Sequence, residues 1–386
     1  MVKTKSSTAA SSLLRRLARE RGEMIAVLRE FVECESPSTD RDAVNEFGAL
    51  VARHFDVLGA RTRVHRLSNR SNAFQFDFSA ETSAPRALLL GHLDTVYDLG
   101  TLRNMPWREA AGKIYGPGIF DMKAGIMQAI FALRGLLAQG PLPCPVSMLL
   151  VPDEEIGSIH SRLVTEKLAK ECGRVFVLEP AAGPKGACKV GRKGNGVYTL
   201  RVQGIPAHAG LDFVKGASAI LEMSQQIARI GSLSNHARGI TLNPGVIRGG
   251  SRPNVVAAEA EVQIDVRVLT KTQARTIDAR LRHLRPLNHR CRLEVTGGMN
   301  RPPFESNSKT MVLYRRAAAC AAELGFPLEC ATVGGASDGN LTSALGIPTL
   351  DGLGAVGDGS HSSGEHVIAA ELPRRAALLA RLLSTC

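Results

Sequence analysis

Three short apolar runs, each followed at once by acidic or imidazole side chains, most constrain the fold of this chain. The runs span residues 87–90, 146–151 and 174–178. Continuous apolar runs of this length are typical of strands that are buried on both faces of a parallel sheet. Because the carboxyl ends of parallel strands meet at one edge of the sheet, the polar residues after each run are expected to gather there. The sequence therefore predicts an α/β domain whose functional groups lie along one sheet edge.

The middle of the chain has a different pattern, in which strands and helices follow the order βαββαβ of a ferredoxin-like α+β unit. The expected strands are 197–202, 240–247, 255–268 and 291–295, and the expected helices are 216–231 and 272–284. Outside this segment, helices are expected at 13–34, 41–58, 124–137, 308–324 and 370–384. We therefore predict a catalytic α/β domain with a mixed sheet, formed by residues 1–192 and 301–386, with the ferredoxin-like domain inserted at 193–300.

Composition excludes several classes of partner. The 386 residues carry 48 Lys and Arg against 36 Asp and Glu, a formal net charge of +12. This positive charge is the one feature that favours a nucleic-acid-binding protein. The low aromatic content of 4% argues against one, because aromatic side chains provide the surfaces on which bases stack. The eight cysteines form no CxxC pair, which indicates reduced thiols and a cytoplasmic location. No apolar run approaches the roughly 18 residues of a membrane-spanning helix, so we expect neither a nucleic-acid nor a membrane partner.

Strand ends are expected to supply a set of acidic and imidazole side chains. In chain order they are His92, Asp94, Asp121, Glu154, Glu155, Glu179 and His361. Taken singly, each is more often structural or solvated than functional. Together, imidazole and carboxylate without thiolate suit divalent ions such as Zn²⁺, Co²⁺ or Mn²⁺. Five ligands exceed what one tetrahedral zinc takes and fit two ions that share a carboxylate, with positions open for water and substrate.

Ten segments in this order make the chain recognisable. They are 91–96 (GHLDTV), 116–125 (GPGIFDMKAG), 153–158 (DEEIGS), 178–180 (LEP), 207–210 (AHAG), 254–256 (NVV), 265–267 (DVR), 300–304 (NRPPF), 334–340 (GGASDGN) and 361–365 (HSSGE). With them the chain resembles the co-catalytic zinc aminoacylase and carboxypeptidase family, and within it the glutamate carboxypeptidases of the carboxypeptidase G type. The resemblance runs from about residue 25 to the C-terminus.

The resemblance implies a role for each residue of the metal set. His92 and Glu179 would bind the first ion, Glu155 and His361 the second, and Asp121 would bridge both. Two divalent ions are therefore expected, most simply Zn²⁺, with Co²⁺ or Mn²⁺ as substitutes.

Three further residues would support this chemistry. Asp94 would orient the imidazole of His92 by a hydrogen bond from outside the metal shell. Glu154 would be the general base that takes a proton from the attacking water and returns it to the leaving amine. Glu365, four residues after His361, is expected to support that histidine or the Gly-rich loop at 334–340.

Two residues of the inserted domain are also candidates. His208 resembles a lid histidine that reaches from one subunit into its partner's active site and stabilises the oxyanion. The alternative is a turn histidine without a ligand. Asn254 resembles a residue that binds the substrate or the tetrahedral intermediate. The inserted domain is accordingly expected to be a lid that also joins two subunits as a homodimer.

Two arginines complete the candidate site. In the glutamate carboxypeptidases, arginines at the positions of Arg267 and Arg301 would clamp the carboxylates of the C-terminal residue, a task that suits guanidinium geometry. The alternative for Arg267 is a salt bridge with Asp265 or Glu261.

The sequence thus predicts a metal-dependent hydrolase of an amide bond beside a free carboxylate. We expect a carboxypeptidase that releases C-terminal glutamate or a similar amino acid from a small peptide. A deacylase of N-acyl amino acids, like acetylornithine deacetylase or succinyl-diaminopimelate desuccinylase, remains open because both reactions use the same core chemistry. A metal-binding scaffold without turnover is the third class, and the complete ligand set argues against it.

Overall fold

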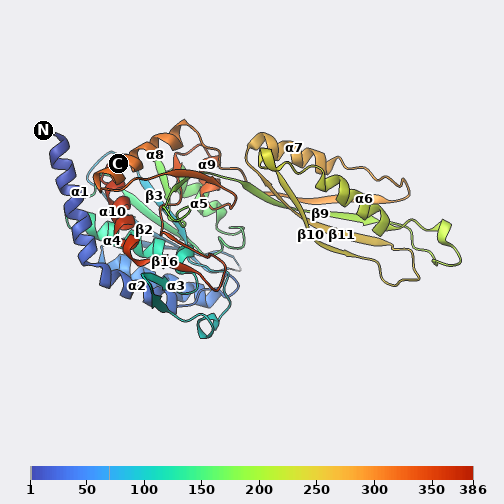
Figure 1. The fold of residues 1–386 in the computed structure, drawn as a ribbon, viewed down its shortest axis with the longest axis horizontal. Helices are drawn as coiled ribbons and strands as arrows, with labels where there is room; N and C mark the ends of the chain where they lie inside the picture. Colours follow the sequence, from blue (N-terminus) through green and yellow to red (C-terminus); the bar gives the residue numbers. More distant parts are fainter. Residues whose placement is uncertain (1, 69, 386) are drawn as a thin grey trace. The chain divides into compact units, whose positions relative to one another are not determined.

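The chain divides into two compact units, which are described separately (Figure 1). The computed structural model describes residues 2–68 and 70–385. Unit 1 consists of Met1–Gly191, Ser306–Val333 and Ser337–Cys386, and unit 2 of Arg192–Glu305 and Gly334–Ala336. Among the described helices, none combines the length and the apolar character that crossing a membrane requires.

Unit 1 is built on a six-stranded mixed sheet in the order β1-β2-β6-β3-β7-β14. The strands are β1 (Arg61–His65), β2 (Ala73–Phe78), β3 (Ala87–His92), β6 (Val146–Val151), β7 (Arg174–Val177) and β14 (Thr349–Leu350). Strands β6, β3, β7 and β14 run parallel, whereas β1 and β2 are antiparallel to their neighbours. The predicted α/β class with a mixed sheet is confirmed.

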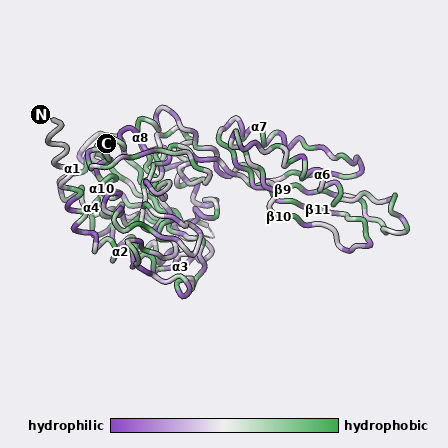
Figure 2. The backbone as a smooth tube through the Cα atoms, in the orientation of Figure 1, coloured by the Kyte–Doolittle hydropathy of each residue, from purple (hydrophilic) through white to green (hydrophobic). Residues whose placement is uncertain are grey.

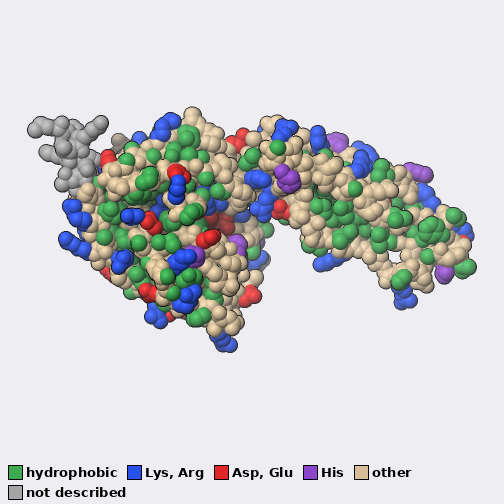
Figure 3. Space-filling view, viewed as in Figure 1, with side chains coloured by type: hydrophobic (Ala, Val, Ile, Leu, Met, Phe, Trp, Pro, Cys, Tyr) green, Lys and Arg blue, Asp and Glu red, His purple; other side chains and the backbone are tan. Residues whose placement is uncertain are grey.

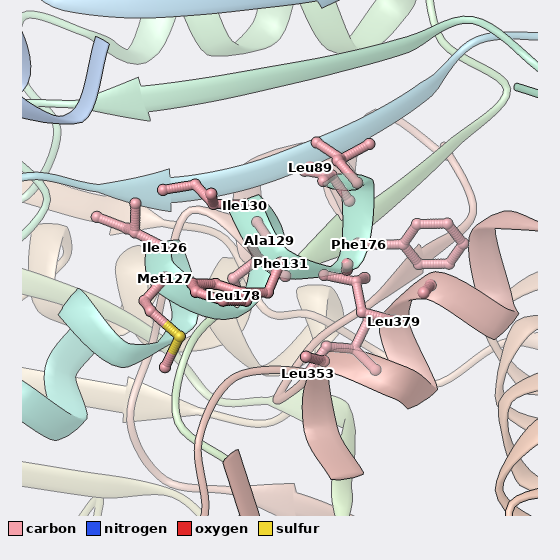
Figure 4. Close-up of a cluster of buried hydrophobic side chains, with 14 of the residues drawn as sticks. Leu89, Ile126, Met127, Ala129, Ile130, Phe131, Phe176, Leu178, Leu353 and Leu379 are labelled. Carbon is pink, nitrogen blue, oxygen red and sulfur yellow. The ribbon is translucent and has the colours of Figure 1, made fainter. Parts of the chain in front are cut away.

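The three apolar runs are buried because helices cover both faces of this sheet. The helices of unit 1 are α1 (Val2–Arg19), α2 (Arg21–Glu33), α3 (Arg41–Val57), α4 (Ala124–Leu137), α5 (Arg162–Lys170), α8 (Ser308–Glu323), α9 (Gly339–Ala344) and α10 (Leu372–Leu383). Leu89 faces the larger core with Phe131 of α4 and Leu379 of α10 (Figure 4). Its neighbours Leu88 and Leu90 face the opposite core, which α5 covers. The side chains of successive residues in β3 therefore pack into different cores on the two faces of the sheet.

A second, small antiparallel sheet brings distant segments of unit 1 together. It consists of β4 (Arg108–Ala110), β5 (Lys113–Tyr115), β15 (Gly357–Asp358) and β16 (His366–Ile368), in the order β15-β16-β5-β4. His366 pairs with Tyr115, so the chain after β5 lies beside the loop before β16. The short strands β8 (Cys188–Arg192) and β13 (Cys330–Val333) form a separate pair.

Unit 2 is an antiparallel sheet with the order β10-β11-β9-β12. Its elements are β9 (Gly194–Gln203), α6 (Ala219–Gly231), β10 (Thr241–Gly249), β11 (Glu259–Val268), α7 (Lys271–Arg282) and β12 (Arg292–Arg301). Apolar and polar residues alternate along β11 (EAEVQIDVRV; unit 2 is coloured by hydropathy in Figure 2), and Tyr198, Leu200 and Val262 pack against Met223 of α6 and Ile277 of α7. The predicted ferredoxin-like βαββαβ order is confirmed.

Several expected elements had the wrong extent; the strand expected at 255–268, for example, begins at Glu259. The helix expected at 13–34 is two helices, α1 and α2, which meet at Glu20. The strand expected at 291–295 continues through Gly297 and Gly298 to Arg301. A Cβ at position 297 would lie 2.2 Å from the carbonyl oxygen of Val197. The close approach of β9 and β12 at this point therefore requires glycine.

The first turn of α4 packs directly on the end of β7. A Cβ at Gly125 would lie 2.3 Å from the carbonyl oxygen of Leu178. Backbone cannot yield as a flexible side chain can, so any larger residue must push α4 away from the strand end.

We predict that Gly125→Ala destabilises the chain by about 1–3 kcal/mol, because the added methyl group overlaps this carbonyl. Urea-induced unfolding followed by circular dichroism measures the change. Gly22→Ala in α2 is the matched control, since nothing lies within 4 Å of a Cβ there. The control is expected to leave stability unchanged or raise it by up to about 1 kcal/mol. Equal effects of the two substitutions would contradict the packing argument.

Candidate metal centre

Three neighbouring strands deliver four of the candidate residues to one edge of the central sheet. His92 is the last residue of β3, Glu154 and Glu155 follow β6, and Glu179 follows β7. Because β6, β3 and β7 are adjacent and parallel, their carboxyl ends meet at this edge. The structure therefore brings these four residues together as the sequence pattern indicated.

Asp121 and His361 reach the same place by other routes. Asp121 lies in the kinked turn η2 (Ile119–Lys123) that precedes α4, where its own backbone is not helical, and His361 lies in the loop between β15 and β16. The expectation that strand ends of the sheet supply both residues is wrong. Their segments meet instead through the pairing of β5 with β16. His361 has a φ of 62°, a left-handed conformation that costs about 1 kcal/mol or more in a residue other than glycine.

The five candidate ligands form two triads that share Asp121. In the first, His92 Nε2 lies 3.3 Å from Asp121 Oδ1 and 3.5 Å from Glu179 Oε1. In the second, His361 Nε2 lies 3.2 Å from Glu155 Oε2 and 3.6 Å from Asp121 Oδ2. Each triad thus receives one oxygen of the shared carboxylate.

The spacing of these atoms fits metal coordination. Ligands at 2.0–2.1 Å from a tetrahedral ion lie about 3.3 Å from one another, close to the 3.2–3.6 Å observed. Glu155 Oε1 is buried and has no hydrogen-bond partner within residues 2–68 and 70–385. A buried carboxylate oxygen is costly without a partner, and a cation in the second triad would provide one.

The electrostatics of the site favour positive charge. Burial alone would lower the pKa of His92, but hydrogen bonds with Asp121, Asp94 and Glu179 raise it well above the usual imidazole value. Hydrogen bonds with Asp121 and Glu155 raise the pKa of His361 to about 10. The carboxylates therefore create a field that holds a proton on each imidazole, or a metal ion in place of the protons.

Asp94 holds both an imidazole and the backbone of two glutamates. His92 Nδ1 lies 2.9 Å from the main-chain carbonyl oxygen of Asp94 and 3.5 Å from its carboxylate. The carboxylate accepts the backbone N–H groups of Glu154 and Glu155, both at 3.1 Å, and the hydroxyl of Ser38 at 2.7 Å. A proton on Nδ1 leaves Nε2 of His92 as the metal-binding nitrogen. Asp94 orients the imidazole through its backbone carbonyl at least as much as through its carboxylate.

Comparison with known proteins supports a peptidase. Residues 88–385 match the family model for peptidase family M20/M25/M40. The chain belongs to this family. Carboxypeptidase G2 from Pseudomonas sp. (strain RS-16) is 29% identical over 303 residues, covering 77% of this chain and 72% of that protein. The M20 chain described here is thus a metallopeptidase that is similar to carboxypeptidase G2.

Solved structures share the fold. Aminopeptidase PepT from Bacillus cereus has a TM-score of 0.77 at 20% identity, covering 94% of this chain and 98% of that chain. The Bacillus subtilis YXEP protein, which is described as a dinuclear metal-binding peptidase of the M20 family, has a TM-score of 0.68 at 16% identity. That match covers 95% of this chain and 98% of that chain.

In this M20 peptidase, His208 and Asn254 lie together in unit 2. His208 bridges to Val255, and the N–H of Ala209 donates to the carbonyl oxygen of Asn254. Both His208 and Asn254 are exposed. Nδ1 of His208 accepts the N–H groups of Gly210 and Leu211, each at 3.1 Å. The ring proton of neutral His208 is therefore on Nε2, which can donate to a ligand.

Arg267 and Arg301 lie at the other end of strand β9. Both pair with Asn195, one from β11 and one from β12, so they share a face of the sheet. Arg267 lies 3.0 Å from Asp265, so the salt bridge that was the alternative to substrate binding is present. Arg301 is buried.

Sequence reasoning missed one arginine, Arg192 of unit 2, and one lysine, Lys123 of unit 1. Arg192 donates to the carbonyl oxygens of Gly335 and Ala336, next to Gly334, which accepts from Arg267. Lys123, two residues after Asp121, donates to the carbonyl oxygens of Phe31 and Cys34 at the end of α2. Burial lowers the pKa of Lys123 to about 8. The sequence feature that could have predicted this interaction is the position of Lys123 immediately before the apolar helix α4.

Proposed function

We propose that the protein is a dinuclear metal carboxypeptidase that releases glutamate or a similar amino acid from the C-terminus of a small peptide. The observation that carries this proposal is the sharing of Asp121 between two ligand triads, with Glu154 next to Glu155 of the second triad. The similarity to carboxypeptidase G2 supports the choice of reaction.

The donor set suits two Zn²⁺ ions, with Co²⁺ or Mn²⁺ as substitutes, because it contains imidazole nitrogen and carboxylate oxygen without thiolate. Such ions would polarise the scissile carbonyl and lower the pKa of the attacking water. His92, Asp121 and Glu179 would hold one ion, and Asp121, Glu155 and His361 the other.

Glu154 would move the proton. It is 8% exposed, and the hydrogen bond from its N–H to Asp94 fixes its backbone at the site. It accepts a proton from the attacking water and delivers it to the nitrogen of the leaving amino acid. Glu155 follows Glu154 directly but points into a triad, so one of the two adjacent glutamates binds metal and the other remains a base.

The two ends of unit 2 would serve two different active sites. Arg267 and Arg301 flank the start of β9 at Asn195, and His208 follows its end at Gln203. Eight residues of strand span about 26 Å, farther than a dipeptide reaches. His208 and Asn254 would therefore act in the site of a partner chain, with unit 2 joining a homodimer. The exposed apolar residues Leu221 on α6 and Ile247 on the edge strand β10 support such an interface.

Charge favours an acidic substrate. From Arg192 to Glu305, unit 2 has 17 Lys and Arg against eight Asp and Glu, so +9 of the net +12 lies there. Figure 3 shows many basic and few acidic side chains on the visible face of unit 2. A positive field concentrates anionic substrates near the enzyme, and Arg267 and Arg301 would clamp their carboxylates.

We predict that Glu154→Gln lowers kcat by about 10²–10⁴-fold, because the amide cannot accept the proton. Steady-state kinetics of the metal-loaded chain measures the loss, and elemental analysis is expected to find unchanged metal content. Glu81→Gln, at an exposed position, is the matched control. Activity of Glu154→Gln close to that of the control would exclude Glu154 as the base.

We predict that kcat/KM for dipeptides and N-acyl amino acids with C-terminal glutamate exceeds that for acetylornithine and succinyl-diaminopimelate by about tenfold or more. A panel assay with the Zn²⁺- or Co²⁺-loaded chain measures the ratio. Arg267→Ala is expected to reduce this preference by raising KM for glutamate substrates, whereas Arg275→Ala on the exposed face of α7 leaves it unchanged. The reverse preference would identify a deacylase.

We predict that mixing inactive Glu154→Gln and His208→Ala chains restores activity. In a mixed dimer, one site has an intact Glu154 and receives His208 from the other chain. Random exchange gives about a quarter of the activity of unsubstituted dimers. Subunits are mixed in mild denaturant, returned to buffer and assayed. If His208 serves its own chain, every site lacks one group and activity stays at the level of the separate variants.

A further inference from the structure

Glu365 is a fully buried carboxylate in the loop that also carries His361. The loop connects β15 to β16, and Glu365 is its last residue before β16 begins. Isolated buried carboxylates are strongly unfavourable, so a charge in this position requires compensating partners.

Four donors from two other segments satisfy this carboxylate. Oε1 accepts the N–H groups of Phe120 at 2.8 Å and Asp121 at 2.9 Å. Oε2 accepts the N–H of Gly118 at 3.0 Å and the hydroxyl of Tyr97 at 2.5 Å. A carboxylate has about four lone-pair directions, so Glu365 has no acceptor capacity left with which to bind a metal ion.

These bonds connect segments that carry metal ligands. Gly118 to Asp121 form the turn that presents the shared carboxylate. Tyr97 lies five residues after His92, and its hydroxyl, which donates to Glu365, also lies 3.0 Å from the carbonyl oxygen of Ser362, next to His361. The N–H of Gly116 in turn donates to the carbonyl oxygen of Glu365. The Asp121 turn and the His361 loop are thus joined through one side chain.

The two triads depend on this junction to different degrees. In the second triad, Asp121 and His361 both lie on segments that Glu365 connects. In the first triad, Asp121 is linked directly and His92 only remotely, through Tyr97 five residues further along the chain, because His92 ends β3 and Glu179 follows β7. Loss of the junction should therefore disturb the second triad more.

We propose that Glu365 is a positioning residue that sets the metal affinity of the second triad by fixing the Asp121 turn to the His361 loop. The inference rests on the proposed dinuclear site. Glu365 acts through backbone N–H groups and Tyr97 and contacts neither substrate nor metal.

Glu365→Gln tests this role, because replacing one oxygen with an NH₂ group removes acceptors for two of the four donors. The metal-free chain is titrated with Zn²⁺ in the presence of a competing chelator, which resolves two dissociation constants. His361→Ala identifies the constant that belongs to the second triad. We expect Glu365→Gln to weaken that constant by about tenfold and the other by less than about threefold. Tyr97→Phe is expected to give the same pattern with smaller changes.

Glu371→Gln is the matched control, since Glu371 lies a few residues further on and pairs with Arg374. It is expected to change neither constant. Equal weakening of both constants, or no weakening, would overturn the proposal. If Glu365→Gln fails to fold by circular dichroism, Tyr97→Phe decides by the same criterion. Binding of fewer than two ions by the unsubstituted chain would contradict the proposed function itself, whatever the effect of Glu365.

Discussion

The carboxylate of Asp121 must present one oxygen to His92 and the other to His361, and much of unit 1 keeps it in that position. Gly125 lets the helix after Asp121 close onto the carbonyl oxygen of Leu178, one residue before Glu179. Lys123 ties the same turn to the end of α2. The carboxylate of Glu365 accepts the backbone N–H groups of Phe120 and Asp121 in this turn. A displacement of the turn would change the distances in both triads at once.

The same arrangement accounts for the chemistry. Asp121, Glu155 and Glu179 lie in one largely buried region, where like charges repel and desolvation is costly. Their field raises the pKa values of His92 and His361, so the region binds positive charge whichever cation supplies it. Two divalent ions would satisfy the carboxylates, and Glu154, outside both triads, would remain available to accept a proton. The net positive charge of unit 2 supports the proposal that the substrate is acidic.

The sequence indicated the strand-end residues because burial and polarity change abruptly there. Short, continuous apolar runs predicted β3, β6 and β7, and His92, Glu154 and Glu179 followed from their ends. Asp121 and His361 depend on β5 and β16, which have three residues each, too few to give a hydrophobic period. The hydrogen bonds of Lys123, and those that Asp94 accepts from Glu154 and Glu155, are with main-chain groups, which no residue pattern specifies. The strand expected at 291–295 was too short because the close approach of β12 to β9 at Gly297 becomes visible only after the strands are paired.

The central claim is that one carboxylate serves two metal ions. Anomalous diffraction from crystals grown with Zn²⁺, recorded above and below the zinc absorption edge, tests it most directly. We expect two anomalous peaks about 3.5–4 Å apart, one beside each oxygen of Asp121, with His92 and Glu179 around the first and Glu155 and His361 around the second. A single peak, or two peaks of which one does not contact Asp121, would contradict the account.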